Sequence, residues 1–230
     1  MAEFYDRTAK LIGEEGIALL KSKKVIIFGC GGVGGYVAES FARCGIGEIG
    51  LCDFDKVDVT NINRQIIALQ ENIGNFKTEE FKKRIVQINP ECKVHLYSER
   101  YTEDNGRMLE EVEWDYCIDA IDSIRDKVSL ILACKKKNIK IISAMGAGNR
   151  IQIPRFDIID IYDTKYDGLS KAVRKRLRAE GVEELKVCCT DVPPIKTEGG
   201  QVGSIVYFPA VCGMTIAAFV VNQLLETVNF

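Results

Sequence analysis

The sequence predicts an α/β fold, a doubly wound, mostly parallel Rossmann-like sheet with a C-terminal strand and helix extension. Short apolar runs alternate with amphipathic segments from residue 23 to residue 149, as in repeated β-α units. A glycine-rich turn joins the first apolar run to a helix, and an acidic residue closes the second run. The chain has 230 residues, of which 47% are hydrophobic, so it can bury a sizeable core.

The first half is expected to form a helix followed by a β-α-β unit. In chain order the elements are an amphipathic helix at 1–22, a buried strand at 23–30, a helix at 35–44, a second strand at 48–55, and a loop through 57–65. The next segment favours a helix that Thr78 caps and Pro90 ends.

Alternation continues from residue 93 to residue 145. The expected elements are a strand at 93–99, a short helix at 102–112, a strand at 114–122, a helix at 123–138 capped by Ser123, and a strand at 139–145. Parallel strands joined by right-handed crossovers predict a ligand site at the carboxyl ends of the strands.

Beyond Gly148 the pattern is less regular. We expect a strand at 157–163, a basic helix at 168–181, a strand at 185–190, a Pro-Pro loop, and a last strand at 203–208. A break at Pro209 then leads to a buried helix from about Ala210 to Glu226. The uncharged stretch 199–225 is long enough to span a bilayer, but its proline, glycines and amides argue against that, so no membrane partner is expected.

Charge and cysteine content restrict the function classes. Thirty-one Lys and Arg against 33 Asp and Glu leave a net charge of −2, so no overall basic field indicates nucleic acid. The nine cysteines include no C-x-x-C pair, which argues against a structural zinc site and favours small buried hydrophobes. With no secretory signal at the N-terminus, we expect a cytoplasmic protein.

A phosphate-binding turn is the first functional motif. Gly29, Gly31, Gly32 and Gly34 fit G-x-G-x-x-G between a strand and a helix, where backbone N–H groups and the helix dipole favour phosphate. Asp53 ends the next strand, where a carboxylate accepts hydrogen bonds from ribose hydroxyls. These features alone make a nicotinamide dehydrogenase the default interpretation.

The continuation of the sequence favours triphosphate cleavage instead. Arg64 and Lys77 supply positive charge that a departing pyrophosphate needs and that hydride transfer does not. Asp122, at the end of the fourth strand, is suited to hold Mg²⁺, which binds one or two carboxylates together with phosphate oxygens. Asp55 and Asp58 are expected to be turn or solvent residues, and Asp119 to support the fold near the site.

Four separated motifs, GCGGVGG, DFDKVDVTNINRQ, the lysine of NFKTE, and DAIDS, resemble the adenylation domain of ubiquitin-activating enzymes and the bacterial ThiF, MoeB and HesA proteins. The resemblance implies that 1–230 is one adenylation domain, with an N-terminal helix at 1–22, a nucleotide-binding core at 23–149, and a substrate-side extension and final helix at 150–230. It assigns Gly32 and Asp53 to the adenosine of ATP and Asp122 to the metal. The residues it assigns to the phosphates are Asn61, Arg64 and Lys77. Ser123 stands where many relatives have Asn and is expected beside the nucleotide.

Within that family, RTAKLIGEEGIALL, NINRQIIAL, INPEC and DAIDSIRDK most resemble the tRNA threonylcarbamoyladenosine dehydratase (TcdA/CsdL) branch. This implies ATP-dependent cyclisation of the modified adenosine 37 of tRNA through an acyl-adenylate, with release of pyrophosphate and AMP. It also implies a homodimer in which Arg7 reaches the partner's triphosphate. A cysteine desulfurase or sulfur-carrier protein is a further possible partner.

Two other functions are kept open. The first is an adenylyltransferase that activates the C-terminal carboxylate of a ubiquitin-like sulfur carrier, although zinc-binding members of that class carry C-x-x-C pairs that this chain lacks. The second is an NAD-binding oxidoreductase or nucleotide sensor, which leaves Arg64, Lys77 and Asp122 without a role.

Several further residues have a structural and a functional interpretation. His95 lies inside a strand and is expected to be structural, which excludes a Ser-His-Asp mechanism. Cys188 and Cys189 invite a covalent role, but nothing in the sequence lowers their pKa. The basic residues of the 168–181 helix form either a solvated face or a patch for tRNA phosphates: Lys171, Arg174, Lys175, Arg176 and Arg178.

Overall fold

The computed structural model describes residues 3–197, 199 and 202–226, so a few residues of the expected 1–22 and 150–230 segments lie outside the described residues. Its strands form one seven-stranded sheet of order β3-β2-β1-β4-β5-β7-β6. The strands are β1 Lys24–Phe28, β2 Glu48–Cys52, β3 Lys93–Tyr97, β4 Tyr116–Asp119, β5 Ile141–Ala144, β6 Asp157–Asp160 and β7 Lys186–Cys189. Only β6 is antiparallel to its neighbour, so the predicted mostly parallel α/β fold is confirmed.

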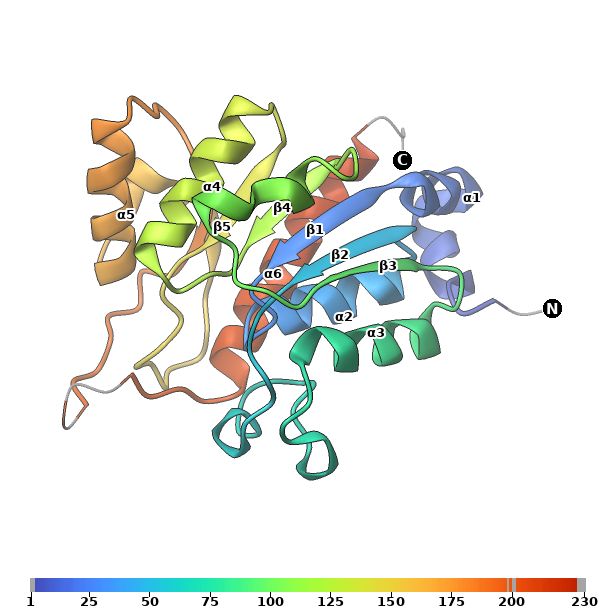
Figure 1. Cartoon of the computed structure of the whole chain (residues 1–230), viewed down its shortest axis with the longest axis horizontal. Coiled ribbons are helices and arrows are strands. Elements are labelled where there is room, and N and C mark those ends of the chain that lie inside the picture. Colours follow the sequence, from blue (N-terminus) through green and yellow to red (C-terminus); the bar gives the residue numbers. More distant parts are fainter. Residues whose placement is uncertain (1–2, 198, 200–201, 227–230) are drawn as a thin grey trace.

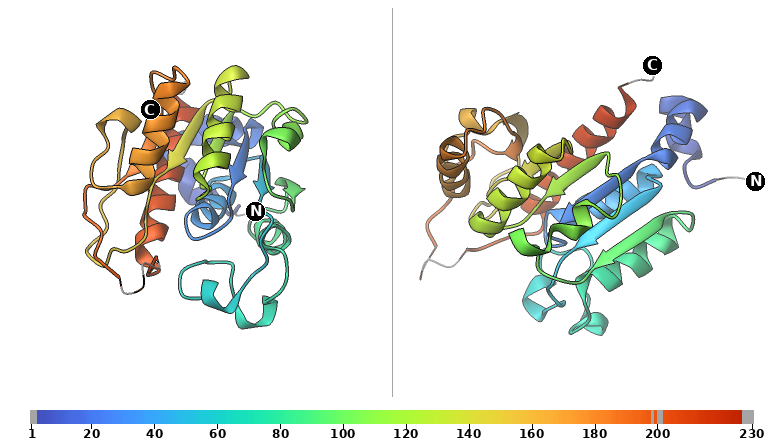
Figure 2. Two further views of the ribbon diagram at one scale, coloured as in Figure 1. Left: turned by 60° about the vertical axis from the view of Figure 1, so that its left-hand side comes forward. Right: turned by 45° about the horizontal axis from the view of Figure 1, so that its top comes forward.

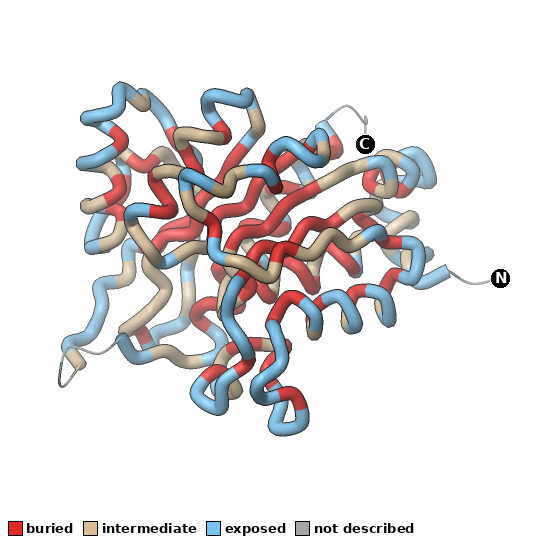
Figure 3. Tube along the Cα trace, in the orientation of Figure 1, coloured by how far each residue is buried: buried red, intermediate tan, exposed pale blue. Residues whose placement is uncertain are grey.

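Helices cover both faces of the sheet (Figures 1 and 2). One face carries α1 Asp6–Ser22, α2 Gly34–Cys44, α3 Lys77–Ile88 and α6 Tyr207–Leu225. The opposite face carries the 3₁₀ segment η3 Glu103–Leu109, α4 Ile124–Lys136 and α5 Gly168–Ala179. Each strand of a two-sided sheet alternates its side chains between two cores, and β1 does so: Val25 and Ile27 pack in one core, and Ile26 and Phe28 in the other. Buried backbone therefore runs through the centre of the molecule (Figure 3).

The sheet reverses its order between β1 and β4. From β1 the chain adds β2 and β3 on one side, and β4, β5 and β7 then extend the other side. Crossovers leave in opposite directions at such a switch point, so the loops separate there and leave a crevice at the carboxyl ends of the strands. The long loop after β2, drawn in teal in Figure 1, extends beyond this edge of the sheet.

Two local predictions were wrong. Thr78 does not cap α3, because the helix begins at Lys77 after Phe76, and the Thr78 hydroxyl is buried 2.6 Å from Ser98 Oγ. Residues 203–208 do not form a strand, and α6 begins at Tyr207. The β-branched and aromatic residues of that segment suggested a strand, but Pro209 is tolerated in the first turn of a helix, where its missing N–H group needs no partner.

Helix α6 is long and apolar enough by composition to cross a membrane, and 56% of its apolar window is buried in the fold. It packs against α2 and α1 and under β5, β6 and β7. This placement explains the uncharged C-terminal stretch as a core helix.

Candidate active site

An open cleft of about 1030 Å³ lies at the switch point. Its walls come from the loops after β1, β2, β3, β4, β5 and β7 and from the starts of α5 and α6. Most of the predicted site residues line it, namely Gly29, Gly31, Gly32, Asp53, Asn61, Arg64, Lys77, Asp122 and Ser123. Segments far apart in the sequence thus meet at one place.

The glycine turn directly follows β1 and packs very closely against the backbone just after β4. Gly29 has φ +89°, and a Cβ atom there would lie 2.6 Å from the carbonyl oxygen of Ala120. Gly34 does not line the cleft, but a Cβ on it would lie 1.8 Å from the Gly29 carbonyl oxygen. Only glycine allows this approach, which directs the N-terminus of α2 toward the cleft.

Asp53 is held rigidly at the floor of the cleft. Its carboxylate accepts hydrogen bonds from the N–H groups of Cys30, at 2.6 Å, and Asp55, at 2.8 Å. Burial raises the pKa of the Asp53 carboxyl, and the nearby Lys77 and these two N–H groups oppose that rise. The carboxylate therefore joins the glycine turn to the end of β2 and presents a fixed acceptor.

Lys77 is almost completely buried, at 4% exposure, and its Nζ lies 2.7 Å from Asp55 Oδ2. Asp55 was expected to be a turn or solvent residue, but it lines the cleft and pairs with this lysine. Asp58 does act as a turn residue, because its carboxylate caps the short helix that begins at Val59. Since the Asp55 side chain is 49% exposed, the ammonium can exchange this partner for a phosphate oxygen.

Arg64 offers a guanidinium that no carboxylate of the described residues neutralises. Its Nη1 donates to the carbonyl oxygen of Thr60, at 2.8 Å, and to Asn63 Oδ1, at 2.9 Å. The backbone carbonyl of the buried Asn61 in turn accepts from the Arg64 N–H, which fixes the turn. Neither of the two groups that accept from the Arg64 guanidinium is a carboxylate, so its positive charge remains available to an anion in the cleft.

Asp122 follows β4 and is exposed at the cleft, and no hydrogen bond or ion pair engages its carboxylate in the part of the chain that the structure describes. A free carboxylate beside a phosphate site suits Mg²⁺, which keeps most of its coordination for water and phosphate. Ser123 caps α4, with its Oγ accepting from the Asp126 N–H at 3.5 Å.

Asp119 supports the fold behind Asp122, as expected. It forms an ion pair of 2.8 Å with Lys127, and both side chains are fully buried. The second Asp119 oxygen accepts from the Ile121 N–H, and Lys127 Nζ also donates to the Ala144 carbonyl oxygen. This clamp ties the ends of β4 and β5 to α4 and fixes the turn that carries Asp122. Lys127 was not predicted from the sequence.

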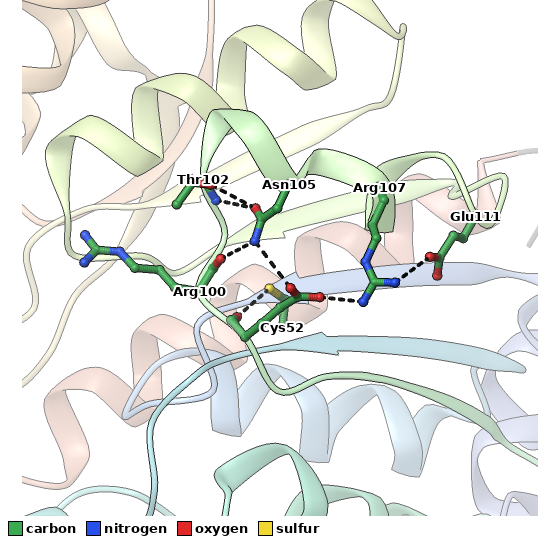
Figure 4. A network of polar contacts seen from close by, with 7 residues as sticks. Cys52, Arg100, Thr102, Asn105, Arg107 and Glu111 are labelled. Atoms are coloured by element: carbon green, nitrogen blue, oxygen red, sulfur yellow. Dashed lines mark hydrogen bonds and ion pairs between the residues drawn. The ribbon is translucent and has the colours of Figure 1, made fainter.

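One cleft wall depends on a polar network that the sequence did not predict. Asn105 donates to the carbonyl oxygen of Arg100 and accepts from the Thr102 N–H, each at 2.6 Å, and Arg107 pairs with Glu99 (Figure 4). The Arg100 side chain points away from this network and pairs with Asp126 instead. The network therefore holds the loop after β3 against the cleft.

Gln65 and Arg150 also line the cleft and were missed. The Oε1 atom of Gln65 is buried without a hydrogen-bond partner among the described residues. Arg150 donates to the carbonyl oxygens of Gly146, Gly148 and Val192, which joins the loops after β5 and β7. Arg150 lies in the loop that follows β5, six residues after the end of that strand, and its place at the edge where strand ends converge was the available signal.

The remaining candidate residues named from the sequence do not line the cleft. Arg7 is exposed on the first turn of α1, outside the cleft. His95 pairs with Glu48 on the neighbouring strand at 2.8 Å, a structural role. Burial raises the pKa of the Cys189 thiol to about 11, and Cys188 is enclosed beside the thiol of Cys212, 3.6 Å away. None of these environments activates a nucleophile.

The comparisons with known proteins agree with this geometry. The sequence model of the ThiF family matches residues 5–229. A Bacillus subtilis tRNA threonylcarbamoyladenosine dehydratase is 38% identical, over 100% of this chain and 97% of that protein. The Escherichia coli enzyme TcdA in complex with ATP superimposes with a TM-score of 0.91 and 34% identity, over 96% of this chain and 93% of that one. Its complex with AMP gives 0.90 and 32%, over 98% of each chain. A Drosophila willistoni adenylyltransferase and sulfurtransferase is 32% identical, but over only 53% of this chain and 26% of that protein.

Proposed function

The chain belongs to the ThiF family, and on that premise we propose that it is an ATP-dependent dehydratase that cyclises N6-threonylcarbamoyladenosine at position 37 of tRNA. One observation carries the proposal. A single cleft holds a glycine turn, the fixed carboxylate of Asp53, the cations of Arg64 and Lys77, and the exposed carboxylate of Asp122, which has no partner among the described residues. A cleft that only bound a dinucleotide would have no use for the cations and the free carboxylate.

The nucleotide is bound by the end of β1 and the start of α2. Backbone N–H groups of Gly31 and Gly32 face the phosphates, supported by the helix dipole. Asp53 accepts hydrogen bonds from the ribose hydroxyls, because its carboxylate is already oriented by two backbone N–H groups.

The departing pyrophosphate is stabilised by Arg64 and Lys77. Among the residues that the structure describes, Arg64 has no carboxylate partner to displace, and Lys77 exchanges Asp55 for a phosphate oxygen. Asn61 supports the same phosphate-binding role, because its backbone carbonyl oxygen accepts from the Arg64 N–H and fixes that turn. Asp122 is the residue that would hold Mg²⁺, and the ion would supply charge neutralisation on the phosphate oxygens.

Two steps give the overall loss of water. A carboxylate oxygen of the threonyl group attacks the α-phosphorus of ATP, a P–O bond breaks, and pyrophosphate leaves with its electron pair. A neighbouring nitrogen of the same substrate then attacks the activated carbonyl carbon, loses its proton, and expels AMP. Ring closure is intramolecular, so the cleft has only to orient the substrate, and no protein nucleophile is required.

A homodimer is part of this proposal. Within one chain Arg7 lies on α1, outside the cleft, so it can serve catalysis only in the cleft of a second copy. A two-fold axis would deliver both arginines symmetrically.

The test is to incubate the protein with ATP, Mg²⁺ and tRNA carrying N6-threonylcarbamoyladenosine, and to weigh the nucleosides after digestion. We expect a product lighter by one water, formed together with AMP, and much less of it with Arg64→Gln. Unchanged nucleosides, with pyrophosphate exchange only after a ubiquitin-like carrier is added, would support the carrier-protein adenylyltransferase. Bound nicotinamide in the purified protein would support the oxidoreductase.

A further inference from the structure

Helix α5 starts at the active-site cleft and leads away from it along the surface. Asp167, Gly168 and Leu169 all line the cleft. The Asp167 carboxylate caps the helix by accepting from the Ser170 N–H and hydroxyl, and it also accepts from the N–H of Gly146 in the loop after β5. The position of α5 is thus fixed by the cleft itself.

One face of α5 is strongly basic, and we call the residues Lys171, Lys175 and Arg178 the α5 basic face. Their spacing of four and three residues places them on one side of the helix, where they line a shallow depression of about 530 Å³. Between residues 164 and 179 there are six basic residues and one acidic residue, in a chain whose net charge is −2. The positive charge is therefore local.

These three side chains are not neutralised by the protein. They are exposed, and within the described ranges no carboxylate lies at ion-pair distance from any of them. Basic residues of other helices do form such pairs, for example Lys83 with Glu80 and Lys137 with Glu110. Like charges that lie close together on a helix destabilise the fold, and binding of a polyanionic partner would offset this repulsion.

An exposed aromatic residue directly precedes the cleft-lining residues at the start of α5. Tyr166 directly precedes the cap residue Asp167, the residue is 66% exposed, and its backbone has φ +55°, which non-glycine residues rarely adopt. Arg174 holds the turn in place by donating to the carbonyl oxygens of Ile161 and Thr164 and to the Thr164 hydroxyl. Such strain persists where the surroundings enforce it, and it concentrates at functional sites.

We propose that the α5 basic face and Tyr166 form the docking surface for the RNA substrate, with the basic face on backbone phosphates and the tyrosine ring stacked on a base beside the reacting adenosine. Unpaired bases of an RNA loop stack on aromatic side chains, and cations alone bind phosphate without reading sequence. The surface also lies next to the cleft, because the cleft-lining residues Asp167, Gly168 and Leu169 stand between Tyr166 and Lys171 in the chain. The inference rests on the proposed function, because it places the substrate of that reaction.

The test measures tRNA affinity as a function of KCl for Lys171→Gln/Lys175→Gln. The matched control is Lys82→Gln/Lys140→Gln, which removes the same charge from exposed positions on α3 and before β5, away from the cleft. Each lost phosphate contact lowers the slope of log affinity against log salt by roughly 0.7 to 0.9, so we expect a decrease of about 1.4 to 1.8 in the first variant and none in the control. ATP binding should be unchanged in both.

Tyr166 is tested separately. Tyr166→Ala should weaken tRNA binding on the order of tenfold, and Tyr166→Phe should restore it, because stacking needs the ring and not the hydroxyl. Equal salt slopes for the two double variants would overturn the inference. So would a Lys171→Gln/Lys175→Gln variant that binds tRNA as the wild type does but loses binding to anionic lipid vesicles. If the wild-type protein failed to dehydrate modified tRNA at all, the proposed function would fall instead.

Discussion

Replacing Lys127 by Met removes one partner of the fully buried pair with Asp119. The Asp119 carboxylate stays buried and keeps only the N–H of Ile121 as a donor. Breaking a buried pair in this way typically costs about 3–5 kcal/mol, against a total stability of about 5–15 kcal/mol for a domain. Because the clamp also fixes the turn that carries Asp122, the remaining folded protein should show a several-fold higher KM for ATP.

The assay is urea unfolding followed by circular dichroism. With a slope of about 2–3 kcal/mol per molar, the midpoint should fall by roughly 1–2 M. The matched control is Lys136→Met, an exposed position on the same helix, which should change stability by less than about 0.5 kcal/mol. Asp119→Asn/Lys127→Met should recover part of the loss, because no charge is then left unpaired. A loss below about 1 kcal/mol, or one equal to that of the control, would refute the reasoning.

Three further predictions concern the site and the fold. Asp122→Asn should lower kcat for AMP release on the order of 10² or more with little change in Tm, because this carboxylate is exposed, has no partner among the described residues, and is the proposed ligand for Mg²⁺; a decrease below threefold would contradict the role. Burial raises the pKa of Glu39, but hydrogen bonds from Arg84 and Arg43 outweigh it and lower the pKa below 4.5. The carboxylate therefore contributes stability above the unfolded-state pKa that is lost as the pH falls through the lower folded value, and Glu39→Gln should be less stable than wild type at pH 7, with a gap that closes in acid unfolding curves. Cys189→Ala should keep its activity within about threefold, since a thiol with a pKa of about 11 is not a nucleophile at neutral pH; complete loss of AMP release with the fold intact would restore a covalent mechanism.

The site residues that could be predicted from the sequence are those that follow a strand and belong to a recognisable motif. Asp53 and Asp122 each follow a buried strand, so their convergence followed from the parallel sheet alone. Lys127 could not be found in this way, because an interior lysine of a helix looks like any surface lysine until the ends of β4 and β5 close over it. Arg150 was missed for a related reason, since it acts through three backbone carbonyls that carry no signal in the sequence.

The error at residues 203–208 has a tertiary cause. Ile205, Val206 and Phe208 favour a strand, yet β5 already has β7 as its neighbour, and β6 occupies the far side of β7. The segment lies instead beside the cleft, where Ser204 accepts a hydrogen bond from Asn63 through its carbonyl oxygen. Local propensity was overridden by the available pairing partners.

The central claim is that the substrate carboxylate attacks the α-phosphorus of ATP. It is tested most directly by labelling the carboxylate oxygens of the tRNA-bound threonylcarbamoyl group with ¹⁸O and weighing the AMP that is released. Cleavage of an acyl-adenylate at the carbonyl carbon leaves one substrate oxygen on phosphorus, so we predict AMP with a single ¹⁸O atom and unlabelled pyrophosphate. Unlabelled AMP, or label in inorganic phosphate released with ADP, would contradict the adenylation mechanism.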